Sequence, residues 1–238
     1  MAAQFHLGEI AVDVVQKDIK NIHLSVHPPM GKVRIAAPLR MDLDTIRVFA
    51  ITKLTWIKSQ QRKLREQERE TAREYLDRES HYLWGKRYLL KMIEREAAPS
   101  VALKHSKMIL QLRPASSMER KQATLDGWYR EQLKEAAPAL IAKWERIIGV
   151  KANRFFVQKM KTKWGSYSPG PKNIRLNTDL AKKPMQCLEY IVAHELTHLL
   201  ERHHNERFNT LMNAHMPLWR QYREMLNSLP LAHQEWGY

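Results

Sequence analysis

Apolar and polar residues alternate along several short stretches of the chain, as expected of strands with one buried face. Turn-forming residues separate these stretches, with Pro28, Pro29 and Gly31 between two of the short strands and a Gly-, Ser- and Pro-rich turn over residues 164–171. The predicted strand regions are residues 10–36, 81–113, 155–160 and 173–177.

Longer stretches carry apolar residues at the three- and four-residue spacing of helices. Asp42 is a good N-cap for the first of them. Pro138 and Pro217 are expected to interrupt two others, because proline lacks the amide proton that an internal helical residue donates. The predicted helical regions are residues 42–76, 117–148, 185–200 and 205–228.

The chain has 238 residues and a formal net charge of +15, which favours polyanionic partners such as nucleic acids, nucleotides or acidic proteins. Residues 151–183, just ahead of the third predicted helix, contain nine basic residues and one acid, Asp179. Cys187 is the only cysteine, which excludes a disulfide framework and a structural zinc site built on several thiolates. No apolar run approaches the roughly 20 residues of a membrane span, so we expect a cytoplasmic protein without membrane contact.

The strongest chemical signal is His-Glu-X-X-His at His194, Glu195 and His198, inside the apolar 185–200 helix. Residues four apart lie about 40° from each other around a helix, so the two imidazoles project from one face and can bind one zinc ion. Glu195 points to the side, where its carboxylate can take a proton from water and pass it to a leaving group. Because these residues would be costly to bury without a partner, the motif predicts a metal-dependent hydrolase.

A catalytic zinc site needs a third protein ligand and an open position. His204 lies six residues after His198, the spacing of the third metzincin histidine, but metzincins carry a glycine where this chain has Glu201. An unbroken helix would turn His204 about 240° away from His198, so the helix must end near residue 200 or 201. The adjacent His203 is the main alternative. Spacing also leaves Glu201, Glu206, His215 and Glu224 as candidates.

Several segments accompany the motif: Trp164-Gly165-Ser166, Arg175-Leu176-Asn177, residues 190–198, His204, Phe208, Trp56-Ile57 and Trp84-Gly85-Lys86. Together they resemble one family, the YgjP-like metal-dependent hydrolases, relatives of the WLM and SprT-like zinc metallopeptidases in the gluzincin group. In two positions the chain departs from the family pattern: His203 stands where the family has asparagine, and Tyr167 where it commonly has cysteine. The resemblance covers most of the chain.

The resemblance implies an α+β fold, with small antiparallel sheets beside a zincin-type active-site helix and additional long helices. We expect residues 1–113 to form a strand-rich subdomain with one long helix and residues 114–238 the catalytic subdomain, within one continuous unit. The family's Asn-His pair implies that His204 is the third ligand of Zn²⁺. An exposed strand edge beside the cleft would pair with an extended peptide. The residues expected to bind substrate there are Trp164, Arg175 and Asn177.

Three functions follow from the motif, the resemblance and the charge. The first is a zinc metallopeptidase that acts on a peptide or protein, with Glu195 as general base. The second is a metal-dependent nucleoside triphosphate pyrophosphatase, which the resemblance allows, although the chain has no Gly-rich phosphate loop. The third is a DNA-associated accessory protease linked to restriction-modification or DNA repair, which the basic charge would suit.

Overall fold

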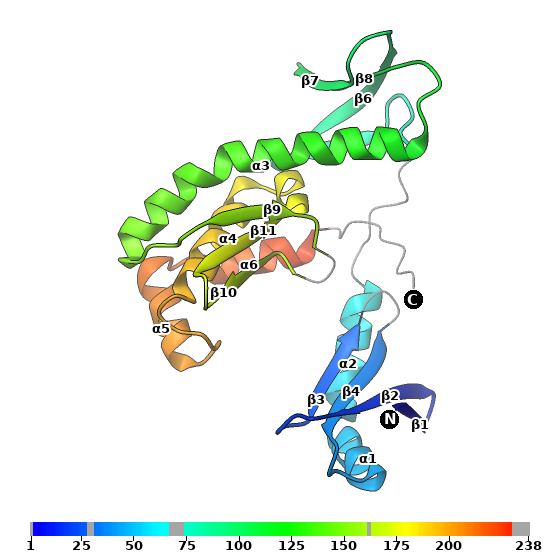
Figure 1. Ribbon diagram of the computed structural model, residues 1–238, viewed down its shortest axis with the longest axis vertical. Coiled ribbons are helices and arrows are strands. Elements are labelled where there is room, and N and C mark those ends of the chain that lie inside the picture. The colour runs from blue at the N-terminus through cyan, green and yellow to red at the C-terminus, as the bar shows by residue number, and fades with distance from the viewer. Residues whose placement is uncertain (1, 28–30, 67–73, 161–162, 230–238) are drawn as a thin grey trace. The chain divides into compact units, whose positions relative to one another are not determined.

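The structure is a computed structural model that describes residues 2–27, 31–66, 74–160 and 163–229 (Figure 1). Helices and small mixed sheets make an α+β fold, which confirms the predicted fold class. The described residues form two compact units, one ending at residue 66 and the other starting at residue 74. No described helix is long and apolar enough to cross a membrane.

The first unit combines two helices with a four-stranded sheet of order β1-β2-β4-β3. Strands β2 and β4 pair in parallel, and the other neighbours are antiparallel. Alternate strand residues, among them Val12, Val33 and Ile35, are fully buried together with Ile46 and Ile57 of the helices. The elements are β1 (Ala2–Leu7), β2 (Ile10–Lys17), β3 (His23–His27), β4 (Lys32–Pro38), α1 (Leu43–Thr52) and α2 (Leu54–Glu66).

The single helix predicted over residues 42–76 is wrong in two respects. It is two helices that separate at Lys53, and residues 74–76 are not helical. The Thr52 hydroxyl donates to the carbonyl three residues earlier, which competes with the backbone hydrogen bonds that would continue α1. The rest of the predicted helix, residues 67–73, lies outside the described residues.

The second unit begins with another four-stranded mixed sheet, of order β5-β6-β8-β7, in which β6 and β8 are parallel. Leu83, Leu90, Met108 and Leu110 of this sheet belong to the same hydrophobic core as the helices that follow. The compact units therefore divide before this sheet, whereas the predicted subdomain boundary, at residue 113, follows it. The strands are β5 (Ser80–Leu83), β6 (Lys86–Glu94), β7 (Ser100–Lys104) and β8 (Lys107–Leu112).

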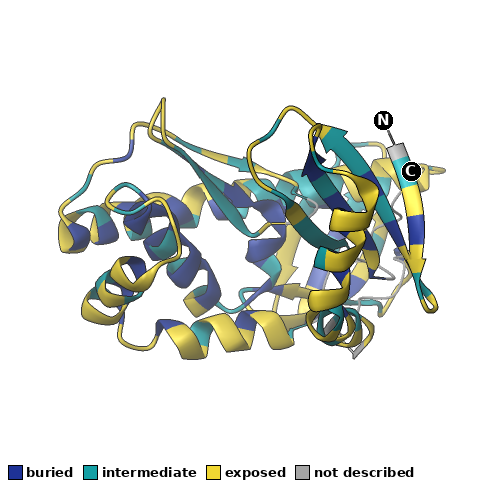
Figure 2. Ribbon diagram, turned by 90° about the horizontal axis from the view of Figure 1, so that it is seen from below, coloured by how far each residue is buried: buried dark blue, intermediate teal, exposed yellow. Residues whose placement is uncertain are grey.

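Helix α3 (Met118–Ile148) runs without a break through Pro138, contrary to the predicted interruption. Leu133, Ala137 and Ile141 on either side of the proline are buried, whereas Pro138 itself is exposed. The carbonyl that lost its amide partner can therefore bond to water, and packing of the buried stripe keeps the helix continuous. Figure 2 shows the same division in the helices, which are yellow on one side and dark blue on the other.

The rest of the second unit is a three-stranded sheet of order β10-β11-β9, with α4 beside it (Figure 1). Strand β11 is parallel to β9 and antiparallel to β10, so the sheets are mixed and not antiparallel as predicted. The turn predicted over residues 164–171 contains the edge strand β10, while the break at Pro217 is confirmed. The elements are β9 (Phe155–Gln158), β10 (Gly165–Ser168), β11 (Asn173–Asn177), the 3₁₀ helix η1 (Thr178–Lys182), α4 (Met185–Thr197), α5 (Glu206–His215) and α6 (Trp219–Ser228).

Candidate metal centre

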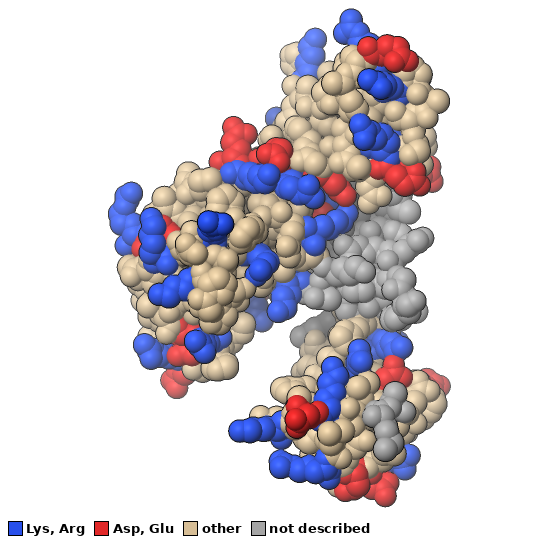
Figure 3. All heavy atoms as spheres, in the orientation of Figure 1, with Lys and Arg blue, Asp and Glu red and all other residues tan. Residues whose placement is uncertain are grey.

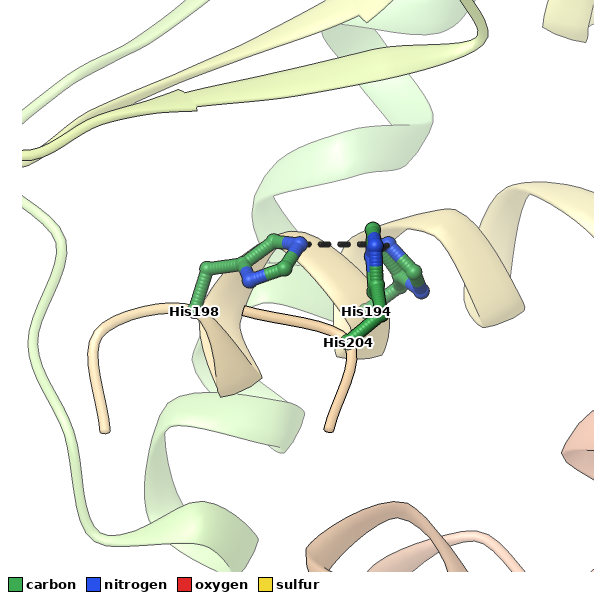
Figure 4. A group of neighbouring side chains, drawn as sticks. All are labelled: His194, His198 and His204. Atoms are coloured by element: carbon green, nitrogen blue, oxygen red, sulfur yellow. Dashed lines mark hydrogen bonds between the residues drawn. The ribbon is translucent and has the colours of Figure 1, made fainter. Parts of the chain in front are cut away.

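Three histidine side chains converge at the C-terminal end of α4 (Figure 4). Nε2 of His194 lies 3.2 Å from Nε2 of His198 and 2.9 Å from Nε2 of His204. His194 and His198 project from one face at the end of α4, as their spacing predicts, and His204 comes from the chain that follows. His203, the alternative to His204, does not belong to this group of described side chains.

The turn that brings His204 back begins earlier than predicted, because α4 ends at Thr197 and not at residue 200 or 201. Two tight turns follow, in which a backbone amide donates to the carbonyl three residues before it. The Glu201 carboxylate then accepts a hydrogen bond from the amide of His203 at 3.1 Å. A glutamate therefore stabilises the reversal that a glycine allows in metzincins.

Two contacts orient the imidazole rings. Nδ1 of His198 lies 3.0 Å from the carbonyl oxygen of Glu201, and donation there leaves the Nε2 lone pair facing the other histidines. Phe208 of α5 is 1% exposed, and its ring centroid lies 5.0, 4.8 and 4.9 Å from those of His194, His198 and His204. The Phe208 ring is thus a common packing surface for all three histidines.

The environment keeps the three imidazoles neutral. Burial, together with the charges of His198, His204 and Arg223, lowers the pKa of His194 to about 3. Burial is also the main cause that lowers the pKa values of His198 and His204. Neutral imidazole is the form that binds a metal ion, so the rings are ready to act as ligands near neutral pH.

The two Nε2 separations from His194 fit a zinc-type ion. A tetrahedral site with Zn–N distances of about 2.0–2.1 Å sets neighbouring ligand nitrogens roughly 3.3 Å apart. The Nε2 separations of 3.2 and 2.9 Å from His194 are close to that value. Three protein nitrogens leave a fourth position for water or substrate, as in catalytic zinc sites.

Glu195 lies beside the histidines, on the face of α4 that meets β10. Its side chain is 5% exposed. Burial raises the pKa of the Glu195 carboxyl to about 8, against the opposing charge of Lys163. A carboxyl group whose pKa lies near neutrality can both accept and return a proton, which is the property that general acid–base catalysis needs.

A comparison with models of protein families identifies the family of this chain. Residues 20–229 match the family described as YgjP-like, metallopeptidase domain. The chain belongs to the YgjP-like family. The match confirms the resemblance and supports a metal-dependent peptidase as the class of enzyme. The comparison with curated proteins gives no match.

Among solved structures, the YgjP-like chain is similar to the metallopeptidase zymogen abylysin of Pyrococcus abyssi. The two have 19% sequence identity and a TM-score of 0.35, and the similarity covers 40% of this chain and 97% of that chain.

Position 165, in the Trp-Gly-Ser segment of the YgjP-like chain, has no room for a side chain, because Glu195 lies against it. A Cβ atom at Gly165 would lie 2.6 Å from Oε1 of Glu195 and 2.8 Å from Cγ2 of Ile191, both on α4. Real Cβ atoms do not come so close to other heavy atoms, so only glycine lets the edge strand approach the helix at this point. The close approach holds the backbone of β10 directly against the Glu195 side chain.

Gly165→Ala is therefore expected to displace Glu195 and lower kcat/KM for a peptide by about 10²-fold, since a shift near 1 Å has effects of this size. Metal content should not change, because Gly165 does not contact the histidine group. Gly170→Ala is the matched control on the same hairpin, since nothing lies within 4 Å of a Cβ there. Steady-state kinetics with metal analysis would test this, and wild-type kcat/KM in Gly165→Ala would contradict it.

Two of the predicted substrate-binding residues of the YgjP-like chain, Trp164 and Asn177, lie beside β10 and support it. The buried Asn177 amide donates to the carbonyls of Met160 and Lys163, both at 2.8 Å. Its backbone amide donates to the Trp164 carbonyl at 2.9 Å. The Trp164 ring packs against the hydrophobic core, with the Lys183 ammonium 5.9 Å from its centroid. Both residues thus hold the chain that leads into the edge strand.

The third predicted residue, Arg175, faces away from Glu195. It lies opposite Ser166 in the β10–β11 pair, so its side chain is on the face of the sheet opposite to that on which a Cβ at Gly165 would stand. Its guanidinium donates to the Ser168 hydroxyl. The structure therefore does not bring Arg175 together with Glu195.

Two features of the centre were not predicted from the sequence. One is the packing of Phe208 against the histidines, and the other is the effect of the Arg223 charge on them. The charge of Arg223, on α6, contributes to lowering the pKa values of His194 and His204. Phe208 stands close to His204 in the chain and belongs to the same family resemblance, which was the available signal that the two side chains lie together. Arg223 lies too far along the chain from the motif for any spacing to reveal it.

The basic stretch over residues 151–183 is partly neutralised by acids from elsewhere. Lysines of its described part form ion pairs, among them two with acids of α3 that a local count of charge cannot find. On the face drawn in Figure 3, basic side chains are scattered among acidic ones, and nucleic-acid binding stays a prediction. The pairs are Lys151–Glu145 at 3.3 Å, Lys159–Asp126 at 3.1 Å and Lys182–Asp179 at 2.7 Å.

Proposed function

We propose that this protein is a zinc-dependent peptidase in which His194, His198 and His204 hold the ion and Glu195 is the general base. The convergence of three Nε2 atoms beside a buried glutamate is the observation that supports it. Zinc is favoured among divalent ions, because three neutral imidazoles with an open fourth position are typical of catalytic zinc sites. A peptide is favoured as substrate, because the family is one of metallopeptidases.

The proposed reaction is hydrolysis of a peptide bond. When bound, zinc polarises the scissile carbonyl and acidifies water. The Glu195 carboxylate takes one proton from the water while the water oxygen bonds to the carbonyl carbon. The carbonyl π electrons move to the carbonyl oxygen at the same time. Glu195 then gives this proton to the amide nitrogen, the C–N bond breaks and the carbonyl re-forms. The second water proton leaves the new carboxyl group for the amine, which yields a carboxylate and an ammonium group.

The outer edge of β10 is the proposed site for an extended substrate. Within the described sheet β10 pairs with β11 alone, so one edge is open. Because the Trp164 carbonyl accepts from the Asn177 amide, alternate residues starting at Trp164 turn their backbone groups toward β11. Gly165 and Tyr167 lie between them and turn N–H and C=O outward. Substrate backbone that pairs there would lie next to Glu195.

The test is incubation of zinc-loaded protein with unfolded casein and, in parallel, with nucleoside triphosphates. We expect peptide-bond cleavage, detected by mass spectrometry, that a chelator abolishes and added zinc restores, and no release of pyrophosphate. Pyrophosphate release with casein intact would contradict the peptidase and favour the nucleotide hydrolase. Salt-sensitive DNA binding alongside cleavage would add the accessory role to the peptidase.

A further inference from the structure

Arg175 is the one charged residue in the three strands of the β10-β11-β9 sheet. It lies opposite Ser166 of β10 and Phe156 of β9, so the three side chains form a row across one face of the sheet. Its neighbours on β11, Ile174 and Leu176, are fully buried on the other face, which meets α4. The row therefore lies on the outer face, where Phe156 is 41% exposed.

Two contacts hold the Arg175 guanidinium on this face. Its Nη1 donates to the Ser168 hydroxyl of β10 at 2.5 Å, and its Cζ lies 5.8 Å from the ring centroid of Phe156 on β9. Because β11 lies between these two strands, the ring supports the group from one side and an N–H group reaches toward β10 on the other. Arg175 forms no ion pair within the described chain, so most of its N–H donors remain available to a further acceptor.

A substrate paired with the outer edge of β10 would add one more strand to this row. Neighbouring strands lie about 4.8 Å apart, and side chains alternate between the two faces of a sheet. A substrate residue opposite Ser168 would turn its side chain to the outer face, within reach of the Arg175 guanidinium. The residues on either side of it would face α4, as the half-buried Tyr167 of β10 does.

The strands of the outer face offer that side chain positive charge and no negative charge. They contain no aspartate or glutamate. Lys163 precedes β10, and Lys172 lies in the turn between β10 and β11. A carboxylate is the group that fits best, because a guanidinium can donate two parallel N–H bonds to its two oxygens.

We propose that Arg175 binds an aspartate or glutamate side chain of the substrate and makes the enzyme selective for peptides that carry an acid at one fixed place. The inference rests on the proposed function. The place is fixed because one strand sets both contacts: Glu195 lies against Gly165, and Ser168 is three residues further on. Three strand residues span about 10 Å, so we expect the acid about three residues from the bond that is cut.

The experiment starts from a casein segment that zinc-loaded wild type cleaves, synthesised with Gln in place of its acidic residues. Glu is placed at each position in turn, and kcat/KM of each Glu peptide is compared with that of the Gln peptide. For wild type we expect a preference for Glu of roughly 5- to 10-fold at one position, through KM, that weakens as salt is added. The preference should disappear in Arg175→Gln. Arg175→Glu should favour lysine at that position, a reversal that a damaged fold cannot produce.

Arg154 provides the matched control. It directly precedes β9, which is at the far edge of the sheet from β10, and it is exposed. Arg154→Gln therefore removes the same charge and should keep the wild-type preference, and Tm reports the folding of each variant. Zinc-loaded Glu195→Gln gives a readout without turnover. By fluorescence anisotropy it should bind the Glu peptide more tightly than the Gln peptide by a similar factor, and adding Arg175→Gln should remove the difference.

Three results would overturn the proposal. One is equal kcat/KM for the Glu and Gln peptides at every position in wild type. Another is an unchanged preference for Glu in Arg175→Gln or Arg175→Glu. The third is an equal loss of preference in Arg154→Gln, which would make the effect one of general charge. In each case wild type still cleaves peptides and the proposed function stands, whereas wild type that cleaves no peptide would remove both.

Discussion

Replacement of Glu195 by glutamine (Glu195→Gln) is expected to lower kcat for peptide cleavage by about 10³-fold or more, while zinc content stays at the wild-type level. Glutamine has nearly the shape of glutamate and fits the buried space against β10, but it cannot take a proton from water. Glu195 is not among the three converging ligand-type side chains, so the ion should remain bound. Single-turnover kinetics and metal analysis on the same preparation would measure both quantities.

The matched control for this substitution is Glu135→Gln, the same chemical change on the exposed face of α3. It should equal wild type in turnover and zinc content. Glu195→Gln that loses its zinc would mean that Glu195 holds the ion directly. Glu195→Gln with full turnover would remove it from the chemistry.

His204→Ala is expected to lose both metal and turnover. Loss of an outer partner of a metal ligand already weakens binding by about 10- to 100-fold, so removal of a ligand should weaken it by more than about 10²-fold. The neighbouring His203→Ala should keep its zinc, because His203 lies outside the converging group and its hydrogen bonds in the turn come from its backbone, which alanine keeps. Competition with a chromophoric chelator would give both affinities.

The opposite pattern would contradict the assignment of the third ligand. If His204→Ala binds zinc as wild type does and His203→Ala does not, the loop after α4 would have to present His203 to the ion. Loss of zinc in both variants, with a lowered Tm in both, would indicate that the loop and not one imidazole had been damaged.

The pattern of apolar and polar residues predicted most helices and strands, because it follows which residues are buried. It gave wrong predictions where tertiary packing determines the structure. The helix pattern around Pro138 is correct, but whether a proline interrupts a helix depends on which side faces water, and this emerges only when the buried stripe of α3 packs. The pairing direction of strands likewise depends on connections across the sheet. The residues of β9 and β10 do not encode this direction, although β11 is parallel to one and antiparallel to the other.

Prediction of the site residues was limited in the same way, because some of them are brought together only by packing. Spacing alone places His194 and His198 on one helix face, because helix geometry is fixed over one turn. His204 required the family resemblance, since its position depends on a turn that Glu201 stabilises in place of glycine. Contacts between distant segments, such as Gly165 with Glu195 and α6 with α4, leave no periodic signal.

The central claim is that His194, His198 and His204 hold one ion together. X-ray absorption at the zinc edge of the zinc-loaded wild-type protein tests it most directly. We predict scattering from three imidazole rings at about 2.0–2.1 Å and one further oxygen or nitrogen ligand. Two imidazole rings, or a sulfur ligand at about 2.3 Å, would contradict the claim.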